Sequence, residues 1–414
     1  MDILRSALHY LVSLLITFIW LPQTCAQSLH LVNGKQSKSI SFNYIKNLII
    51  IPLHLNGKGP YNFVLDTGIG ITLITDPGLA DSLKLTNLRT LKVIGFGEGK
   101  ELLANVTPPL FVNIDNEVFG ELSAAILKED SFSLSSYAGM PVHGLIGYEF
   151  FSSFIVRLNY FTHMLKLYPP DADYVPRRGY HIPIEIEERK PYLKAEISLI
   201  PGEKRKARFI IDTGAGHPLS LETDSAKPYP VPAPRIRANL GIGLGGSING
   251  YIARIPTLTI GKFRFSNVIS AFPDYKDAAG KLASITRNGN IGNTILRRFT
   301  VVFDYNRSSL YLRPNSKYRD PFEHDMSGLE LAWTEPDFKR IIITRIEPGS
   351  AAEEAGLKVN DLILDINLIP VDQIGSEEVY NTFQSGHKRN LVLRIIKGGT
   401  NEIRTLILTL KRRI

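Results

Sequence analysis

The stretch FVLDTGIGITLIT at residues 63–75 returns as FIIDTGAGHPLSLE at residues 209–222. Both copies place Asp-Thr-Gly directly after a short apolar run, with the aspartates at Asp66 and Asp212. Such a run predicts a buried strand, and the glycine after the Asp-Thr pair allows a tight turn that presents the carboxylate. Two carboxylates on duplicated loops are suited to share one proton and to split an amide bond with water.

Other landmarks repeat at matching distances from the two aspartates. A glycine-rich hairpin signal contains Gly97 in the first half and Gly243 in the second, each 31 residues after its aspartate. A Gly-x-x-Gly element follows at residues 144–147 and again at residues 289–292. The chain therefore carries an internal repeat with a period of 146 residues, which predicts two similar halves.

Short apolar and alternating runs separated by Gly, Pro and Asn fill the chain as far as about Asn315, for example at residues 48–55, 110–114, 192–199 and 257–260. This pattern is typical of an all-β fold with many short strands. The proline-rich, charged segment 169–179 cannot continue a central strand, so it is expected to link the two halves. Helical patterning is sparse, and residues 76–85 are the best candidate for a short helix in the first half.

With these motifs, residues 40–315 resemble the aspartic proteases of the pepsin and retropepsin kind. The resemblance implies two pseudo-symmetric β-barrel lobes that each supply one catalytic aspartate, here Asp66 and Asp212. It also implies that the Gly-x-x-Gly segments pack beneath the active-site loops. The substrates would be peptides or proteins, an activated water would be the nucleophile, and no metal or organic cofactor would be needed.

The same resemblance gives roles to neighbouring residues. Thr67 and Thr213 would brace the two loops against each other through their hydroxyls, and Gly68 and Gly214 would permit the turns. The glycine hairpins would be flaps that close over the substrate and exclude water. The candidate flap residues are Phe96, Gly97, Gly243 and Leu244.

One position departs from the family pattern and keeps two other classes of protein open. Ala215 matches the retropepsin form, whereas Ile69 stands where a small or hydroxyl residue is usual, so a hydroxyl beside the first carboxylate is absent. A non-catalytic peptide-binding protein with inactive lobes is therefore one alternative. A carbohydrate-active enzyme would need acids about 5–10 Å apart on unlike scaffolds, and the duplicated triplet argues against it.

The sequence changes in character after Asn315. The run FKRIIITRIEPGSAAEEAGLKVNDLILDIN at residues 338–367 predicts a strand, a turn, a short helix and a glycine stop. With the GLEL segment before it, this makes residues 325–414 resemble a PDZ domain, a small α+β module. The resemblance implies that a peptide adds as an extra strand between strand 329–333 and helix 376–384. Free backbone amides would receive the peptide carboxylate, which would favour C-terminal tails, in the loop Gly328, Leu329, Glu330 and Leu331. An occluded groove in a packing module is the alternative.

The first residues read as a signal peptide. Arg5 supplies positive charge, residues 11–20 supply an apolar stretch too short to favour a spanning helix, and Thr24-Cys25-Ala26 resembles a small-residue cleavage site. An exported chain is therefore expected in the periplasm or outside the cell, with no transmembrane segment after cleavage. A length of 414 residues predicts two or three domains. The expected division is a leader at 1–26, lobes at 27–170 and 180–315, and a PDZ domain at 325–414.

Cysteine and charge give weaker indications. Cys25 is the only cysteine, so a chain cut after Ala26 would have no disulfide, and a lipid anchor on Cys25 is the minor alternative. The net charge of +8 is scattered without a nucleic-acid motif, so no nucleic-acid partner is expected. A monomer is expected because one chain encodes both Asp-Thr-Gly loops.

We predict that the mature protein begins at Gln27, because the charge, apolar stretch and small-residue site occur in the order of a cleaved leader. N-terminal sequencing of protein recovered outside the cytoplasm would check this. Recovered protein that still begins at Met1 would contradict the prediction, and a lipid-modified N-terminus at Cys25 would support the anchored alternative.

Overall fold

A computed structural model describes residues 28–86, 88–93, 102–225, 227–243, 246–275 and 287–414. The predicted leader with Cys25 and the flap candidates Phe96, Gly97 and Leu244 lie outside these ranges. In the described residues the fold is all-β with short helices, as expected from the alternating runs. None of the helices described here is long and apolar enough to cross a membrane.

The first half builds a sheet of eleven described strands in the order β1-β10-β9-β4-β5-β12-β6-β11-β8-β7, with β3 paired to β4. Its strong apolar runs form the predicted strands, and β4 and β9 have the expected bounds. The strands are β1 (Leu29–Leu31), β3 (Asn43–Ile45), β4 (Leu48–Leu55), β5 (Lys58–Leu65), β6 (Thr72–Ile74), β7 (Arg89–Val93), β8 (Leu102–Val106), β9 (Leu110–Ile114), β10 (Val118–Leu122), β11 (Ala124–Leu127) and β12 (Gly144–Ile146).

The second half builds a sheet of eight described strands in the order β16-β17-β18-β23-β19-β22-β21-β20. An additional pairing of β17 with β21 makes this sheet barrel-like. The strands are β16 (Glu185–Glu187), β17 (Lys190–Ser198), β18 (Arg205–Ile211), β19 (Leu219–Leu221), β20 (Arg235–Gly243), β21 (Gly246–Ile260), β22 (Phe263–Pro273) and β23 (Gly289–Ile291).

The centres of the two sheets have the same pattern of strand pairing. In the first, β5 is parallel to β12, β12 is antiparallel to β6, and β6 is parallel to β11. In the second, β18, β23, β19 and β22 repeat these directions in the same order. Phe63 faces Gly144 across the first parallel pair, and Phe209 faces Gly289 across the second. The repeated sequence therefore forms a repeated local structure at the two Asp-Thr-Gly segments.

A third sheet joins the two halves, in the order β15-β25-β24-β13-β14-β2. Its central pair is antiparallel β13 and β24, one strand from each half, with Val156 opposite Phe303. Buried side chains of both halves form one continuous hydrophobic cluster around it. Residues 169–179, the expected linker, contain no described helix or strand. The strands are β2 (Lys38–Ser41), β13 (Ile155–Asn159), β14 (Met164–Tyr168), β15 (Tyr180–Pro183), β24 (Phe299–Asp304) and β25 (Ser309–Pro314).

Short helices occupy the connections. The helix expected over residues 76–85 is shorter than predicted, because the Asp76 carboxylate accepts the Gly78 amide at 2.9 Å before the helix and Lys84 has a left-handed φ of 54° after it. Two other helices each begin directly after a Gly-x-x-Gly element. The helices are η1 (Val32–Gly34), α2 (Leu79–Ser82), α3 (Leu134–Ala138), α4 (Tyr148–Ser153), α6 (Asn293–Leu296) and η3 (Ser316–Arg319).

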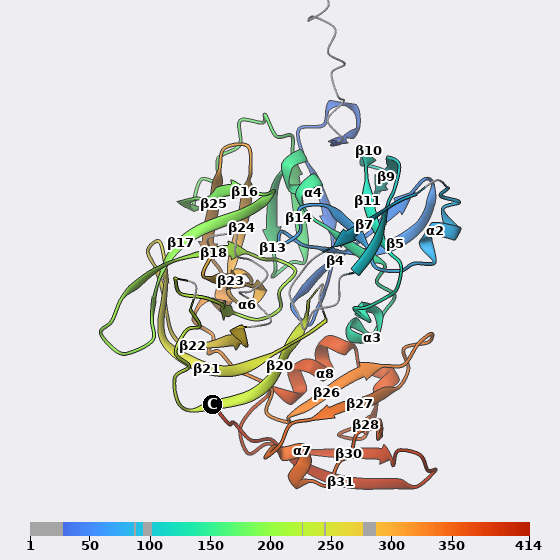
Figure 1. The fold of residues 1–414 in the computed structure, drawn as a ribbon, viewed down its shortest axis with the longest axis vertical. Coiled ribbons are helices and arrows are strands. Elements are labelled where there is room, and N and C mark those ends of the chain that lie inside the picture. The colour runs from blue at the N-terminus through green and yellow to red at the C-terminus, as the bar shows by residue number, and fades with distance from the viewer. Residues whose placement is uncertain (1–27, 87, 94–101, 226, 244–245, 276–286) are drawn as a thin grey trace, which may run out of the picture.

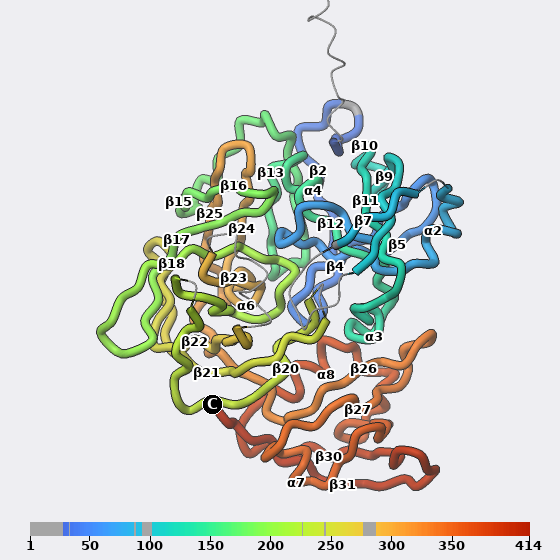
Figure 2. Tube along the Cα trace, viewed as in Figure 1, coloured from blue at the N-terminus to red at the C-terminus, as the bar shows by residue number. Residues whose placement is uncertain are grey.

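The C-terminal module, residues 325–414, has its own sheet in the order β26-β27-β28-β30-β31 and its own hydrophobic core. Strand β26 has the predicted bounds and lies at the sheet edge. Figures 1 and 2 show the module in orange and red beside both halves, with α8 turned toward α3. The elements are β26 (Leu329–Trp333), β27 (Ile341–Ile346), α7 (Ala351–Glu354), β28 (Leu362–Ile366), β29 (Ile369–Pro370), η4 (Val371–Gln373), α8 (Ser376–Phe383), β30 (Asn390–Ile396) and β31 (Ile403–Thr409).

Candidate active site

The two predicted aspartates stand at the ends of equivalent strands. The Asp66 amide donates to the carbonyl of Ile146 at 2.8 Å, and the Asp212 amide donates to the carbonyl of Ile291 at 2.9 Å. These bonds continue the parallel pairs β5–β12 and β18–β23 by one residue. The structure brings the two side chains together on adjacent loops, so that the charge of Asp212 acts on the pKa of Asp66.

The threonines of the triplets brace the two loops reciprocally. The Thr67 amide donates to the Thr213 hydroxyl at 3.0 Å, and the Thr213 amide donates to the Thr67 hydroxyl at 2.9 Å. Each hydroxyl also donates across the interface, Thr67 to the carbonyl of Ile211 at 2.6 Å and Thr213 to the carbonyl of Leu65 at 2.7 Å. Both threonines are fully buried. The arrangement has the form that the resemblance implied.

The glycines of the triplets support the carboxyl groups and make room for them. The Gly68 amide donates to Oδ1 of Asp66 at 2.6 Å, and the Gly214 amide donates to Oδ1 of Asp212 at 2.9 Å. A Cβ on Gly68 would lie 2.9 Å from Oδ1 of both aspartates. A Cβ on Gly214 would collide with the Asp66 carboxyl group. Glycine is therefore required at both positions by the close approach of the opposite loop.

The electrostatics of the pair favour retention of one proton. Burial, and then the neighbouring charge of Asp212, raise the pKa of Asp66 well above its usual range. The Gly68 amide and the Lys190 ammonium oppose this rise. Burial lowers the pKa of Lys190, and the charges of Asp66 and Asp212 act to raise it. Because two like charges in contact are costly, the pair can hold one proton and one negative charge.

Asn290, which the sequence did not single out, contacts the second aspartate, and His217 contacts Asn290. The Asn290 amide group donates to Oδ2 of Asp212 at 2.9 Å, and its oxygen faces Nε2 of His217 within hydrogen-bond distance. The corresponding residue of the first half is Leu145, which has no polar group. The sequence contains one signal for this contact, because the segment GNIG of the second half has an asparagine where the segment GLIG of the first half has a leucine.

A buried ion pair lies near the same aspartate. Nε of Arg287 donates to Glu222 at 2.8 Å, and both side chains are more than 90% buried. Burial raises the pKa of Glu222, and Arg287 opposes the rise. The charge of Asp212 also acts on Glu222. The pair thus adds no net charge near the aspartates.

The position after the first triplet contains a packing residue. Ile69 is partly buried against a hydrophobic cluster, and it lies close enough to Gly147 that a Cβ on this glycine would collide with it. Although Ile69 has no hydroxyl, the Asp66 carboxylate still accepts the Gly68 amide and still lies beside Asp212. Among the flap candidates only Gly243 lies within the described residues, where it ends β20 opposite Gly246.

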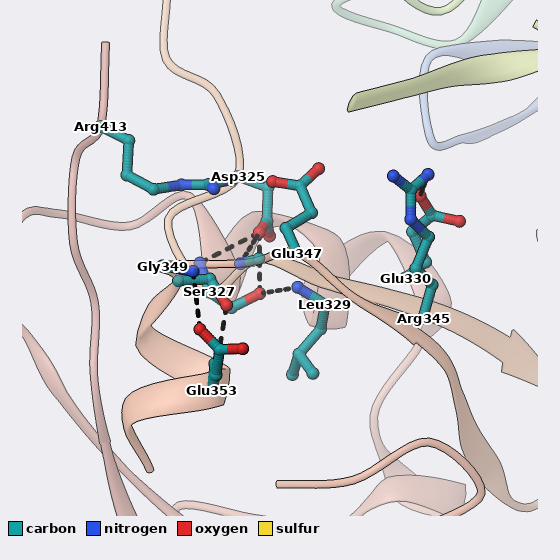
Figure 3. Close-up of polar contacts among 11 residues, drawn as sticks. Asp325, Ser327, Leu329, Glu330, Arg345, Glu347, Gly349, Glu353 and Arg413 are labelled. Carbon is teal, nitrogen blue, oxygen red and sulfur yellow. Dashed lines mark hydrogen bonds and ion pairs between the residues drawn. The ribbon is translucent and has the colours of Figure 1, made fainter. Parts of the chain in front are cut away.

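The loop that would receive a peptide carboxylate is partly satisfied from within the module (Figure 3). The Gly328 amide donates to the carboxylate of Asp325 at 2.6 Å, and the Leu329 amide donates to the Ser327 hydroxyl at 3.0 Å. The expectation of free amides is therefore wrong for Gly328 and Leu329. Burial raises the pKa of Asp325 to about 6, and hydrogen bonds from Ser327 and from the Gly328 amide oppose the rise. The other two loop residues, Glu330 and Leu331, belong to β26, and Glu330 pairs with Arg345 at 3.0 Å.

Helix α3 of the first half lies against one end of the groove between β26 and α8. The Ser376 hydroxyl at the start of α8 donates to the carbonyl of Ala138 at 2.7 Å. Gly139 packs so closely on Trp333 of β26 that a Cβ would lie 2.8 Å from its ring. The Ser136 hydroxyl donates to Glu335 at 2.8 Å. This end of the groove is covered, which agrees with the occluded alternative.

Helix α8 also contacts the turn between β3 and β4. The Lys46 amide donates to the Glu377 carboxylate at 2.6 Å, and the Asn47 side chain donates to the Tyr380 hydroxyl at 3.3 Å. The Lys46 ammonium lies 4.3 Å from the centre of the Tyr137 ring. Burial lowers the pKa of Lys46 to about 8. The buried Lys46 thus lies where α3 of the first half and Glu377 of the C-terminal module meet.

The same turn reaches the second Asp-Thr-Gly loop. The Asn293 side chain donates to the carbonyl of Asn47 at 2.7 Å and to the carbonyl of Thr213 at 2.5 Å. Arg297 donates to the Asn47 side chain at 3.0 Å. A continuous series of hydrogen bonds thus runs from α8 through Asn47 to the loop that holds Asp212.

We predict that Thr67→Val lowers the free energy of unfolding by roughly 2–4 kcal/mol, because the buried Thr213 amide and Ile211 carbonyl lose their partner. Urea unfolding at equilibrium measures the change. Thr67→Ser keeps the hydroxyl and is the matched control, with a much smaller expected loss. A Thr67→Val protein as stable as the Ser variant would contradict this role of the hydroxyl.

We predict that Glu377→Ala speeds hydrogen exchange of the Lys46 amide, because the amide loses its carboxylate acceptor. The expected acceleration is about 5- to 30-fold, equivalent to roughly 1–2 kcal/mol. The adjacent exposed Glu378 provides the control, since Glu378→Ala should leave this amide unchanged. Equal exchange in the two variants would show that α8 does not hold the turn in solution.

Comparison with known proteins identifies one part of the chain. A family model described as PDZ domain matches residues 342–397, which confirms the expectation for the C-terminal module and brings peptide binding as its general function. The crystal structure of an aspartic proteinase from Irpex lacteus matches with a TM-score of 0.42 and 11% identity, over 69% of this chain and 99% of that chain. A search of curated proteins finds no match. The chain contains a PDZ domain.

Proposed function

We propose that the protein is an aspartic-type endopeptidase in which Asp66 and Asp212 act on peptide bonds. The supporting observation is the close approach of the buried Asp66 carboxyl group to the half-buried Asp212 carboxyl group, on loops that are hydrogen-bonded to each other through their threonines. Such a pair can hold one proton, as acid/base chemistry with water requires. In this proposal residues 27–170 and 180–315 are two pseudo-symmetric lobes, each with one aspartate.

The proposed reaction uses both protonation states of the pair. The ionised carboxylate removes a proton from a bound water, and the oxygen of that water bonds to the carbonyl carbon of the scissile peptide. The protonated carboxyl group donates a hydrogen bond to the carbonyl oxygen as negative charge develops there. Transfer of a proton to the amide nitrogen then allows the C–N bond to break. The pair ends with one proton, as it began.

Export and substrate class also enter as proposals. The leader motif supports action outside the cytoplasm, and the peptidase would act on peptides or proteins there. The PDZ domain supports a second peptide contact. Because α3 covers one groove end and Asp325 engages a loop amide, we propose that the domain acts first as a brace on the first half. Binding of a C-terminal tail would then require these contacts to open.

We predict that Asp66→Asn and Asp212→Asn each reduce peptide cleavage by roughly 10³-fold or more, because neither carboxyl group can perform both proton transfers. A peptide-library digest of the wild type and each variant, over an acidic to neutral pH range, measures this. Wild-type protein that cleaves no peptide at any pH would favour the non-catalytic alternative. Near-normal turnover in either variant would also contradict the mechanism.

The unfolding of Asp66→Asn is the control for this experiment. Folding raises the pKa of Asp66, so its stabilising contribution is complete below the pKa of an unfolded aspartate and is lost as the pH rises through the folded value. An asparagine at this position does not ionise, so the variant does not lose stability in this way as the pH rises. The variant should therefore be at least as stable as the wild type at neutral pH, which separates lost chemistry from lost folding.

A further inference from the structure

The two aspartates of the pair receive unequal numbers of hydrogen bonds. Each accepts an amide hydrogen on Oδ1 from the glycine of its own triplet. Within the part of the chain that the structure describes, only Asp212 accepts a further side-chain hydrogen bond from outside the pair, on Oδ2 from Asn290 at 2.9 Å. In the repeat, Asn290 opposite Ile210 corresponds to Leu145 opposite Val64. The pseudo-symmetry is thus broken at the residue that touches one carboxyl group.

His217 determines how the Asn290 amide is oriented. With the NH₂ group toward Asp212, the Asn290 oxygen faces Nε2 of His217 and can only accept, so His217 must donate. This direction suits an ionised Asp212, which accepts hydrogen bonds and donates none. A protonated Asp212 could still accept from the amide, but the hydrogen bond is stronger when the acceptor is an ionised carboxylate. The contact is therefore complementary to the charged form of Asp212.

The neighbouring charges do not select the same aspartate by themselves. Lys190 at the start of β17 acts on both Asp66 and Asp212, and Glu188 and Arg287 act on Lys190. Glu222 opposes a charge on Asp212, but its own charge is balanced by Arg287.

Tyr305, which follows β24, also faces both members of the pair. Its hydroxyl is buried, and both aspartates raise its pKa further after burial has done so. It therefore stays neutral and favours neither carboxyl group by its charge. Two differences remain, the extra hydrogen bond to Asp212 and the deeper burial of Asp66, and both favour the proton on Asp66.

We infer that Asn290, oriented by His217, is a positioning residue that keeps Asp212 as the ionised member of the pair and leaves the shared proton on Asp66. This inference rests on the proposed peptidase function for its consequence. Asp212 would then take the proton from water, and Asp66 would donate to the substrate carbonyl. The departure from the repeat gives the two equivalent loops different roles.

Asn290→Leu tests the inference, because it copies the residue found in the first half. Carboxyl ¹³C NMR of aspartate-labelled protein follows the titration of each member without any need for turnover. In the wild type, Asp212 should ionise at lower pH than Asp66. In Asn290→Leu its titration should move up by about one pH unit, since loss of a donor disfavours the charged form. Asp66 ionising first in the wild type, or an unchanged Asp212 titration in the variant, would overturn the inference.

His217→Leu is the second variant, and it leaves Asn290 in place without its orienting partner. We expect a shift of the Asp212 titration in the same direction and of smaller size, with an unchanged melting temperature. This variant also keeps the inference testable should Asn290→Leu not fold. No shift in a folded His217→Leu protein would overturn the role of His217.

Activity measurements separate this inference from the proposed function. The acid limb of the kcat/KM profile should move up by about one pH unit in Asn290→Leu. An inactive wild type with the predicted NMR titrations would refute the peptidase and leave the inference intact. An active wild type whose Asn290→Leu variant has an unshifted acid limb would refute the inference and leave the peptidase intact.

Discussion

The reciprocal hydrogen bonds between Thr67 and Thr213 are the interaction on which the candidate site depends. Each buried hydroxyl accepts from the opposite loop and donates to the strand that leads into it. The four bonds fix two loops that are 146 residues apart in sequence. Because these bonds fix the two loops relative to each other, they also fix the positions of the two aspartates that the loops carry. Burial, and then the charge of the neighbouring Asp212, raise the pKa of Asp66 at this place.

Local sequence patterns predicted most of the features that the two halves share, and few of the contacts that occur in one half alone. Strong apolar runs gave β4 (Leu48–Leu55) and β26 (Leu329–Trp333) with their observed bounds, because a buried strand imposes its period on the sequence. The meeting of Asp66 and Asp212 followed from the duplication. The contact of Asn290 with Asp212 could not be read in the same way, since it joins residues 78 apart and one asparagine in a strand has no periodic signal. Docking of α3 on the PDZ groove depends on tertiary packing in the same way.

The PDZ domain is integrated with the rest of the molecule more closely than its separate core suggests. One face of α8 contacts a turn of the first half, and that turn contacts the loop of the second aspartate. A domain that binds peptides in other settings is here in hydrogen-bonded continuity with the candidate active site. Any peptide that enters the groove from the α3 end must compete with contacts made by Ala138 and Gly139. Helix α8 of the PDZ domain and the loop that carries Asp212 are thus connected by hydrogen bonds through one turn of the first half.

The long separation between the two threonines has a consequence for synthesis of the chain. A ribosome makes the protein from its N-terminus, so Thr67 emerges well before the residue that braces it. Until the second triplet has been made and β13 has paired with β24, only one carboxyl group is present and the pair does not exist. Contacts of such high sequence separation form late in folding, because their loop-closure entropy must be overcome first. The nascent chain therefore lacks the aspartate pair, which forms only when both halves are nearly complete.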